Sequence, residues 1–193
     1  MAGESYAGKY LSWLGSTIVN KTNPAVKLGG IMFGNAWIYP LIQTQSYGTY
    51  LHDSMLLAFE DMQNGSSMIE EYKQYVIAEN WNMSIALEEK ILEYFLMMSN
   101  VTNIYNFRYS YELSDINSQH MVEYLNKREV QQALHVQDPI KYEECDNTNG
   151  VFEALLEDLE QDASYLLPHL SLQIPLLFYV SVFPFSFFSL IFH

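Results

Sequence analysis

The chain has 193 residues, which corresponds to one domain or to part of a larger one. Nine basic and 23 acidic residues give a formal net charge of −14, and phosphate backbones would repel such a chain, which excludes nucleic-acid binding. A hydrophobic content of 49% excludes global disorder. The single cysteine, Cys145, excludes an internal disulfide framework and a zinc cluster built on cysteines.

The first predicted elements form an α/β unit. Residues 3–8 predict a turn of small residues, residues 9–20 a helix, and residues 25–33 a strand that Gly29 and Gly30 interrupt. The apolar side chains expected near one face of the helix are Tyr10, Leu11, Leu14 and Ile18. A short buried strand after a helix is typical of a parallel sheet.

The middle of the chain, from about residue 41 to 134, has a helical pattern. Residues 84–98 place Leu87, Ile91 and Phe95 four apart, with charged residues largely elsewhere on the turn. The other helical segments expected here are 66–79 and 121–135, with a loop at 99–118 between helices. Asn126, with Glu129 three residues later, predicts a capped start for residues 127–135. The acidic surplus over 53–162 is typical of solvated helix faces, and an acidic binding surface is the alternative.

The last predicted elements are an amphipathic acidic helix at 151–167 and a strand-like run at 174–180. No Asp, Glu, Lys or Arg follows Asp162. Three interpretations of the apolar C-terminal segment stay open: a buried strand that runs into a non-native tail, a membrane anchor, or an apolar part of a larger assembly. Pro175, Pro184 and the lack of a basic flank argue against a membrane span.

One cluster near the N-terminus indicates chemistry. Residues 3–7 read Gly-Glu-Ser-Tyr-Ala, a G-x-S-x-[GA] pattern ahead of a helix, which is typical of a nucleophile elbow. Small residues two before and two after the serine, here Gly3 and Ala7, are needed because the turn is tight. The serine then projects above the strand end, and the next backbone N–H lies at a helix N-terminus, where it can stabilise an oxyanion.

The full octapeptide GESYAGKY resembles the nucleophile motif of the serine carboxypeptidase family, and the similarity continues in order along the chain. It is closest to the animal vitellogenic-like carboxypeptidases and covers residues 1 to about 179. The further matching segments are GGIMFGNAWIYP at 29–40, the Tyr-bearing helix at 46–51, NVT at 100–102, YNF at 105–107 and KREVQQALHV at 127–136.

This resemblance implies an α/β fold, with a partial α/β-hydrolase sheet and a large helical cap insertion. Residues 1–40 would be a core piece with the nucleophile elbow, and residues 41–150 the helical cap. Residues 151–179 would return to the core as a helix and a strand. Residues 180–193 would be an apolar tail outside the family pattern.

The resemblance also implies the roles of three residues. Ser5 would be the acylating nucleophile, and the backbone N–H of Tyr6 would form half of the oxyanion hole. Glu4 would help to bind the free C-terminal carboxylate of a peptide or protein substrate, through a carboxyl network that favours acidic pH. The reaction would be removal of C-terminal residues, without a metal or other cofactor.

The sequence departs from the family pattern in its triad. A catalytic serine needs a histidine base and an orienting aspartate, yet the family-like strand at 174–179 is followed by no aspartate. His193 has no matching context, and the other histidines are expected to be surface or core residues: His52, His120, His135 and His169. Tyr39 stands where the family has Asp, and Cys145 where members often have a disulfide cysteine.

These departures lead us to expect a central piece of a serine carboxypeptidase, inactive by itself. The segment before Gly3 is too short for the family's upstream strands, so we also expect the elbow to lack its own strand. Residues 1–5 do not form a signal peptide, although the family enters the secretory pathway and reaches lysosomes or the extracellular space. Four N-x-[ST] sequons predict glycosylation at Asn20, Asn64, Asn82 and Asn100, with Asn100 the best candidate.

Two other functional interpretations compete with the enzyme. One is a non-catalytic fragment or pseudoenzyme, associated with a membrane through its apolar tail. The other is an unrelated acidic helical interaction domain, which would make the ordered matches a coincidence. The sequence gives no indication of the oligomeric state.

Overall fold

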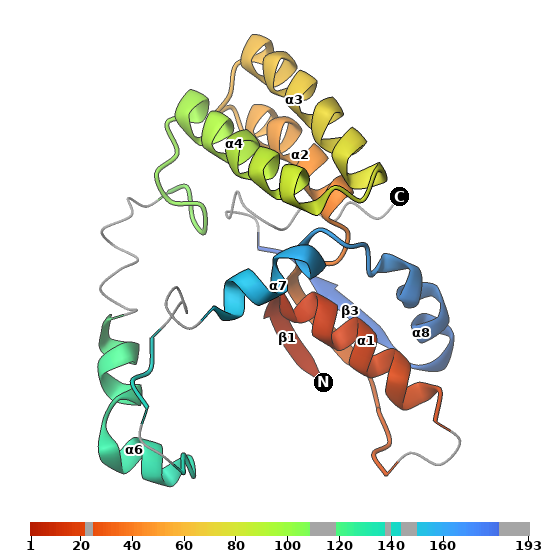
Figure 1. Cartoon of the computed structure of the whole chain (residues 1–193), viewed down its shortest axis with the longest axis vertical. Helices are drawn as coiled ribbons and strands as arrows, with labels where there is room; N and C mark the ends of the chain where they lie inside the picture. The colour runs from red at the N-terminus through yellow and green to blue at the C-terminus, as the bar shows by residue number, and fades with distance from the viewer. Residues whose placement is uncertain (22–24, 109–118, 138–139, 144–149, 182–193) are drawn as a thin grey trace.

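The computed structural model describes residues 1–21, 25–108, 119–137, 140–143 and 150–181. Three strands are present in these ranges: β1 (Ala2–Ser5), β2 (Ile31–Ala36) and β3 (Leu176–Tyr179). The helices are α1 (Ala7–Val19), α2 (Pro40–Asp53), α3 (Phe59–Ile77), α4 (Trp81–Ser99), α6 (Arg128–Ala133), α7 (Val151–Leu159), the single turn η1 (Ser164–Leu166) and α8 (Leu167–Gln173). Figure 1 shows a helical block of α2, α3 and α4 above the sheet with α1 and α8.

The strands form a parallel sheet in the order β1-β2-β3. The predicted parallel sheet is therefore confirmed. The strand expected at 25–33 begins only at Ile31, after the two glycines.

The expectation that the elbow lacks its own strand is wrong. Ala2 to Ser5, of which residues 3–5 were expected to begin a turn, form β1 and pair with β2, for example Gly3 with Phe33. The ammonium of Met1 also donates to the carbonyl of Gly30 over 2.8 Å. The backbone ladder holds this strand, because its small and polar side chains have little β propensity.

Helix α1 covers one face of the sheet, and the predicted apolar face is correct for Leu11, which is buried, but not for Tyr10 and Leu14. Tyr10 and Leu14 are about half exposed, whereas Gly8, Ser12 and Gly15 are buried. The small residues allow the backbones to approach closely: a Cβ at Gly8 would lie 2.5 Å from the carbonyl oxygen of Trp37. The core between the sheet, α1 and α8 consists of Leu11, Ile31, Phe33, Ala36, Ile38, Ala163, Leu167, Leu170 and Ile174.

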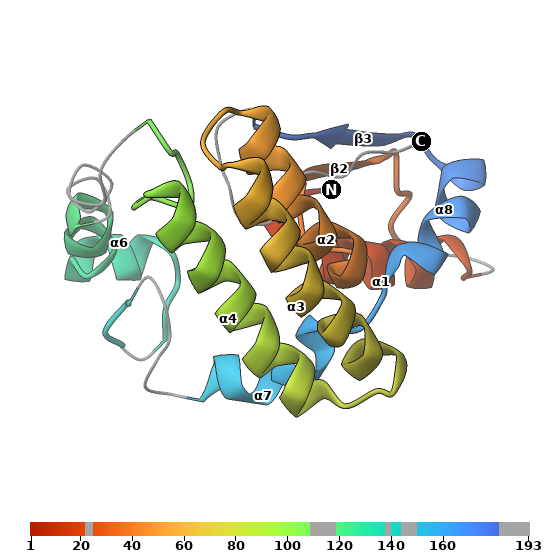
Figure 2. The same ribbon diagram turned by 90° about the horizontal axis from the view of Figure 1, so that it is seen from above.

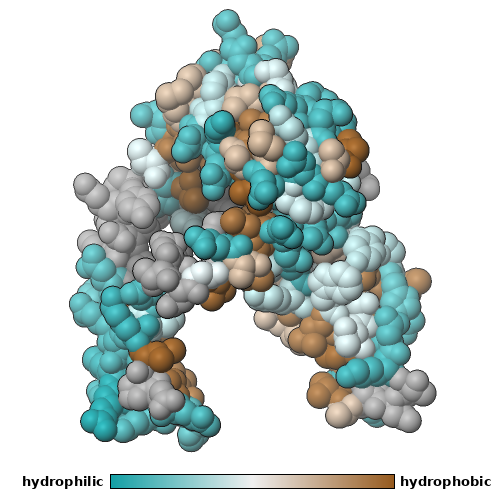
Figure 3. All heavy atoms as spheres, viewed as in Figure 1, coloured by the Kyte–Doolittle hydropathy of each residue, from teal (hydrophilic) through white to brown (hydrophobic). Residues whose placement is uncertain are grey.

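The helical block has a separate core. Helices α3 and α4 confirm the helices predicted at 66–79 and 84–98, and both begin earlier than expected. Figure 2 shows α2, α3 and α4 side by side. Their shared core consists of Tyr47, Leu51, Leu57, Ile69, Tyr72, Ile91, Phe95 and Val101. Hydrophilic side chains cover most of the visible outer face of the block, as the charge pattern indicates (Figure 3).

The helix predicted at 151–167 is interrupted. Helix α7 ends at Leu159, whose carbonyl accepts a hydrogen bond from the indole of Trp37 over 2.7 Å. The next side chain, Glu160, is buried and accepts a hydrogen bond from the phenol of Tyr72. The backbone N–H of Ala163 donates to Ile38 over 2.9 Å. These tertiary contacts turn the chain back to the sheet, where α8 and β3 follow.

The capped start predicted at Asn126 is also wrong. Residues 119–125 and α6 are helical, but the N-cap of α6 is Lys127 and has no side-chain cap. Asn126 instead donates to the carbonyls of Val122 and Tyr142 and accepts from the Tyr142 backbone N–H over 2.9 Å. Its amide thus holds residues 140–143 and does not cap the start of α6.

Candidate functional site

Ser5 lies at a sharp turn between β1 and α1. Its φ is 59°, in the left-handed region that residues with a side chain rarely adopt. A Cβ at Gly3 would lie only 2.6 Å from the Cβ of Ala7, so the turn has no room for a larger residue at position 3. A tight strand-to-helix turn of this kind is what a nucleophile elbow requires, and the lack of room at position 3 agrees with the expected need for small residues beside the serine.

Tyr6 is the N-cap of α1, so its backbone amide lies at the positive end of the helix dipole. The phenol donates to Oδ2 of Asp158 over 2.5 Å, and the ring packs edge-on against Tyr10 with centroids 5.0 Å apart. Burial and the hydrogen bond to Asp158 raise the pKa of Tyr6 well above its ordinary value. The phenol therefore stays protonated and remains a donor across the physiological pH range.

Glu4 is connected to the second strand through Asn35. The Asn35 amide donates to Oε1 of Glu4 over 3.1 Å, and its carbonyl oxygen accepts from the backbone N–H of Ser181 over 2.8 Å. Asn35 itself has a φ of 38°. The next turn is joined to the serine as well, because the Trp37 backbone N–H donates to the carbonyl of Ser5 over 2.8 Å. Glu4, Ser5 and Asn35 are therefore held together where β1 and β2 end.

The turn after β2 depends on Gln43, which sequence reasoning missed. Its buried side chain accepts from the backbone N–H groups of Ile38 and Tyr39, both over 2.9 Å, and donates to the carbonyl of Ala36 over 3.0 Å. The polar contacts that Tyr39 puts in doubt are thus supplied by the following helix. Nothing in the PLIQTQ segment distinguishes this glutamine, so the sequence did not predict its hydrogen bonds to the turn.

Of the described histidines, two form hydrogen bonds away from Ser5 and two are exposed. His52 lies 3.0 Å from the carbonyl of Leu57, and Nε2 of His169 lies 3.0 Å from Oδ1 of Asn20. His120 and His135 are exposed. Within the described ranges, no hydrogen bond joins a histidine to Ser5. His193 and Cys145 lie outside the described residues.

The described part of the chain has neither a metal-binding cluster nor a helix suited to span a membrane. No group of three His, Cys, Asp or Glu side chains in it is placed to hold a metal ion. No helix in the same ranges combines the length and hydropathy of a bilayer span.

The four sequon asparagines are all exposed. Asn100 ends α4 in a left-handed conformation and begins the non-helical segment that follows. Asn64 and Asn82 lie within helices, and the amide of Asn20 is already bonded to Ser16 and His169. Glycosylation at these positions stays a prediction.

Comparison with known proteins identifies the family of the chain that contains this strand, turn and helix. A sequence model of the serine carboxypeptidase family matches residues 1–183. The chain therefore belongs to the serine carboxypeptidase family. The match extends a few residues beyond position 179, where the sequence similarity was expected to stop.

Individual relatives agree with the family. The chain is 30% identical over 150 residues to the venom serine carboxypeptidase of Apis mellifera, covering 70% of this chain and 31% of the relative. It is 25% identical over 168 residues to serine carboxypeptidase-like 50 of Arabidopsis thaliana, covering 86% and 37%. A probable serine carboxypeptidase, CPVL of Rattus norvegicus, is 25% identical over 70% of the chain. These identities do not separate the vitellogenic-like branch from the others.

A solved structure supports the fold. The crystal structure of Kex1Δp, a prohormone-processing carboxypeptidase from Saccharomyces cerevisiae, superposes with a TM-score of 0.75 at 22% identity, over 97% of this chain and 45% of that one. The fold is therefore a partial α/β-hydrolase sheet with helices, as the resemblance implies. The chain spans about a third of the length of the curated relatives named above.

Proposed function

We propose that this chain carries the nucleophile of a serine carboxypeptidase, and that Ser5 is the residue acylated by the substrate. The observation that carries the proposal is the strained turn at Ser5 between β1 and α1, where a Cβ at Gly3 would lie 2.6 Å from that of Ala7. In the reaction, Oγ of Ser5 would attack the carbonyl carbon of the last peptide bond. The C-terminal residue would leave, and water would then hydrolyse the acyl-Ser5 ester.

The neighbouring groups support this role. The backbone N–H of Tyr6 lies at the N-terminus of α1, where it would stabilise the oxyanion of the tetrahedral intermediate. Glu4, with the Asn35 amide bonded to it, would bind the free carboxylate of the substrate. The substrate class is therefore peptide or protein C-termini.

The proton transfers need a base that we assign to another part of the protein. Serine catalysis uses a histidine oriented by an aspartate, whereas His52 and His169 bond elsewhere and His120 and His135 are exposed. We therefore propose that the 193 residues do not hydrolyse peptides by themselves and act only together with segments that supply the histidine and aspartate. The name of the honeybee relative, a venom enzyme, supports a secretory location.

The test is hydrolysis by the gene product extended in both directions along the reading frame. The extended protein should release C-terminal residues from a synthetic peptide, and Ser5→Ala should reduce that rate by at least about 10³-fold, as loss of a nucleophile does. Ser12→Ala, which changes a buried serine on the helix that follows Ser5, is the matched control and should retain activity. Retention of full activity in Ser5→Ala would contradict the proposal.

A non-catalytic role is the second candidate. It is favoured by the one observation that, among the described residues, Ser5 has no histidine partner. Membrane association through the apolar tail belongs to this alternative, and residues 182–193 lie outside the described ranges. An extended protein that folds but releases no residue from any peptide would favour this candidate.

A further inference from the structure

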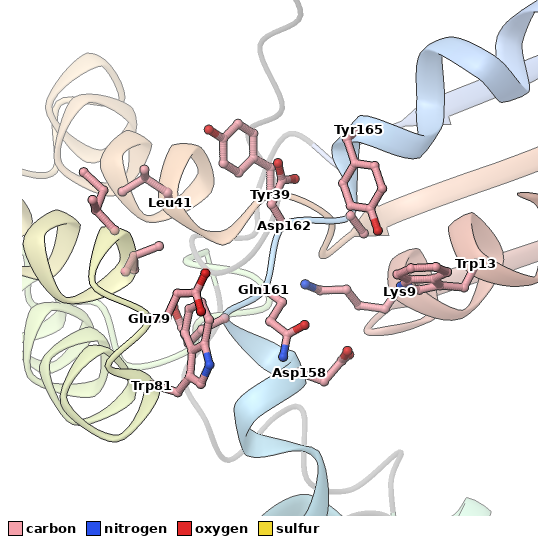
Figure 4. A pocket seen from close by; sticks show the side chains of 14 residues that line it. Lys9, Trp13, Tyr39, Leu41, Glu79, Trp81, Asp158, Gln161, Asp162 and Tyr165 are labelled. Atoms are coloured by element: carbon pink, nitrogen blue, oxygen red, sulfur yellow. The ribbon is translucent and has the colours of Figure 1, made fainter.

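A pocket of about 500 Å³ lies between the sheet layer and the helical block. Figure 4 shows it bounded by α1, by the link between α3 and α4, and by the chain segment that follows α7. Its volume is in the range of small-molecule sites. Glu4 and Ser5 do not contribute to its lining, and the proposed peptidase function gives it no role.

Lys9 is the feature that points to a ligand. Its side chain is 2% exposed and extends into the pocket (Figure 4), yet its ammonium has no hydrogen-bond partner among the described residues. Burial lowers the pKa of Lys9 to about 8, so it carries its charge at neutral and acidic pH. An unpartnered buried ammonium is costly, and an anionic group bound in the pocket would remove that cost.

A simple anion does not fit the rest of the lining. Asp158, Glu160 and Asp162 surround Lys9 closely enough to raise its pKa, and Glu79 lies on the opposite wall. Glu160 is bonded to Tyr72 and Asp158 to Tyr6, whereas Glu79 and Asp162 are exposed carboxylates. This negative rim would repel a lone anion and attract a cationic group. The ligand must therefore carry both charges.

The remaining wall is apolar and aromatic. Leu41, Val76 and Trp81 line the side contributed by the helical block. On the other side the rings of Trp13 and Tyr165 pack edge to face, with centroids 6.0 Å apart. An apolar side chain on the ligand would be buried between these walls.

We propose that this pocket binds a free α-amino acid with a large apolar side chain. Its carboxylate would accept hydrogen bonds from the Lys9 ammonium, and its own ammonium would lie at the rim near Glu79 and Asp162. This places both charges of the zwitterion opposite groups of the other sign and the side chain against the apolar wall.

The experiment is calorimetric titration of the 193-residue protein with L-phenylalanine, with tryptophan fluorescence as a second readout because Trp13 and Trp81 line the pocket. Two analogues divide the recognition: N-acetyl-L-phenylalanine lacks the ammonium, and L-phenylalaninamide lacks the carboxylate. We expect saturable binding of L-phenylalanine, and binding at least about tenfold weaker for each analogue, the usual effect of losing one charge-assisted contact.

Variants then assign the contacts. Lys9→Met should weaken L-phenylalanine binding by about tenfold or more, while the exposed Lys90→Met should leave it unchanged. Ser5→Ala should also bind normally, which separates this proposal from that of the peptidase. Absence of saturable binding in the millimolar range, binding of either analogue as tightly as L-phenylalanine, or unchanged binding by Lys9→Met would overturn the proposal. The analogue comparison needs no variant, so it decides even if Lys9→Met fails to fold.

Discussion

The carboxylate of Asp158 accepts a hydrogen bond of 2.5 Å from the phenol of Tyr6, a residue 152 positions earlier in the chain. This contact ties the end of α7 to the residue that follows the proposed nucleophile. Tyr6 also begins α1, so the same bond fixes the start of the helix. The segment that returns from the helical block thus helps to position the elbow.

Removing this bond should destabilise the protein. We expect Tyr6→Phe to lower the free energy of unfolding by about 1–2 kcal/mol, because the Asp158 carboxylate loses a charge-assisted donor while the ring packing is kept. Urea unfolding of Tyr6→Phe, Asp158→Asn and the double variant gives the coupling energy. Glu157→Gln, at the exposed neighbouring position, is the control. Strictly additive effects of the two changes would mean that the bond contributes nothing.

Because the turn at Ser5 is tight, replacing Gly3 by alanine should cost more stability than replacing Gly29. Gly3→Ala should destabilise by roughly 1–3 kcal/mol, because its Cβ would lie 2.6 Å from that of Ala7. Gly29→Ala places its Cβ in open space, with nothing within 4 Å. Thermal unfolding of both variants under one set of conditions measures the contrast, and equal melting temperatures would argue against the elbow geometry.

Stability should fall as the pH rises from about 5 to about 7. Burial, and secondarily the nearby Glu160, raises the pKa of Glu88 to about 7. Burial also raises the pKa of Glu160. Since the folded protein then binds more protons than the unfolded chain between these pH values, rising pH favours unfolding, by roughly 2 kcal/mol for Glu88. Denaturant unfolding across this range measures the slope.

Glu88→Gln isolates the group responsible. The amide can still accept the hydrogen bond that Tyr47 donates to Glu88 over 3.0 Å, but it does not titrate. This variant should therefore match the parent protein near pH 5, exceed its stability at pH 7 and show a shallower slope. The exposed neighbour, changed in Glu89→Gln, should keep the parent slope. An unchanged slope in Glu88→Gln would rule out this carboxyl as the source.

The sequence was informative where a local pattern decides the structure. Hydrophobic spacing predicted α3 and α4, and the G-x-S-x-A pattern predicted a turn with no room for a larger side chain at position 3. Strand β1 escaped prediction because its ladder with β2, rather than its side chains, holds it. The end of helix α7 at Leu159 was not predicted either, because it depends on the tertiary contacts of Glu160.

The partners of the candidate site were less accessible to prediction. Asp158 lies in an acidic helix where nothing in the local pattern distinguishes it from Glu157, and only the fold brings it to Tyr6. The carboxyamide of Asn35 was visible within a family-like motif, but its bond to Glu4 follows from the pairing of β1 with β2. Contacts between residues on different strands or distant segments produce no regular spacing in the sequence, so a single sequence does not predict them.

The central claim, that Ser5 is the nucleophile, is tested most directly by covalent labelling with a fluorophosphonate and mapping of the labelled peptide by mass spectrometry. In the protein extended along its reading frame, we expect one label, on Ser5, that disappears in Ser5→Ala, and we expect no label on the isolated 193 residues. A label on a different serine, or peptide hydrolysis by an extended protein whose Ser5 stays unlabelled, would contradict it.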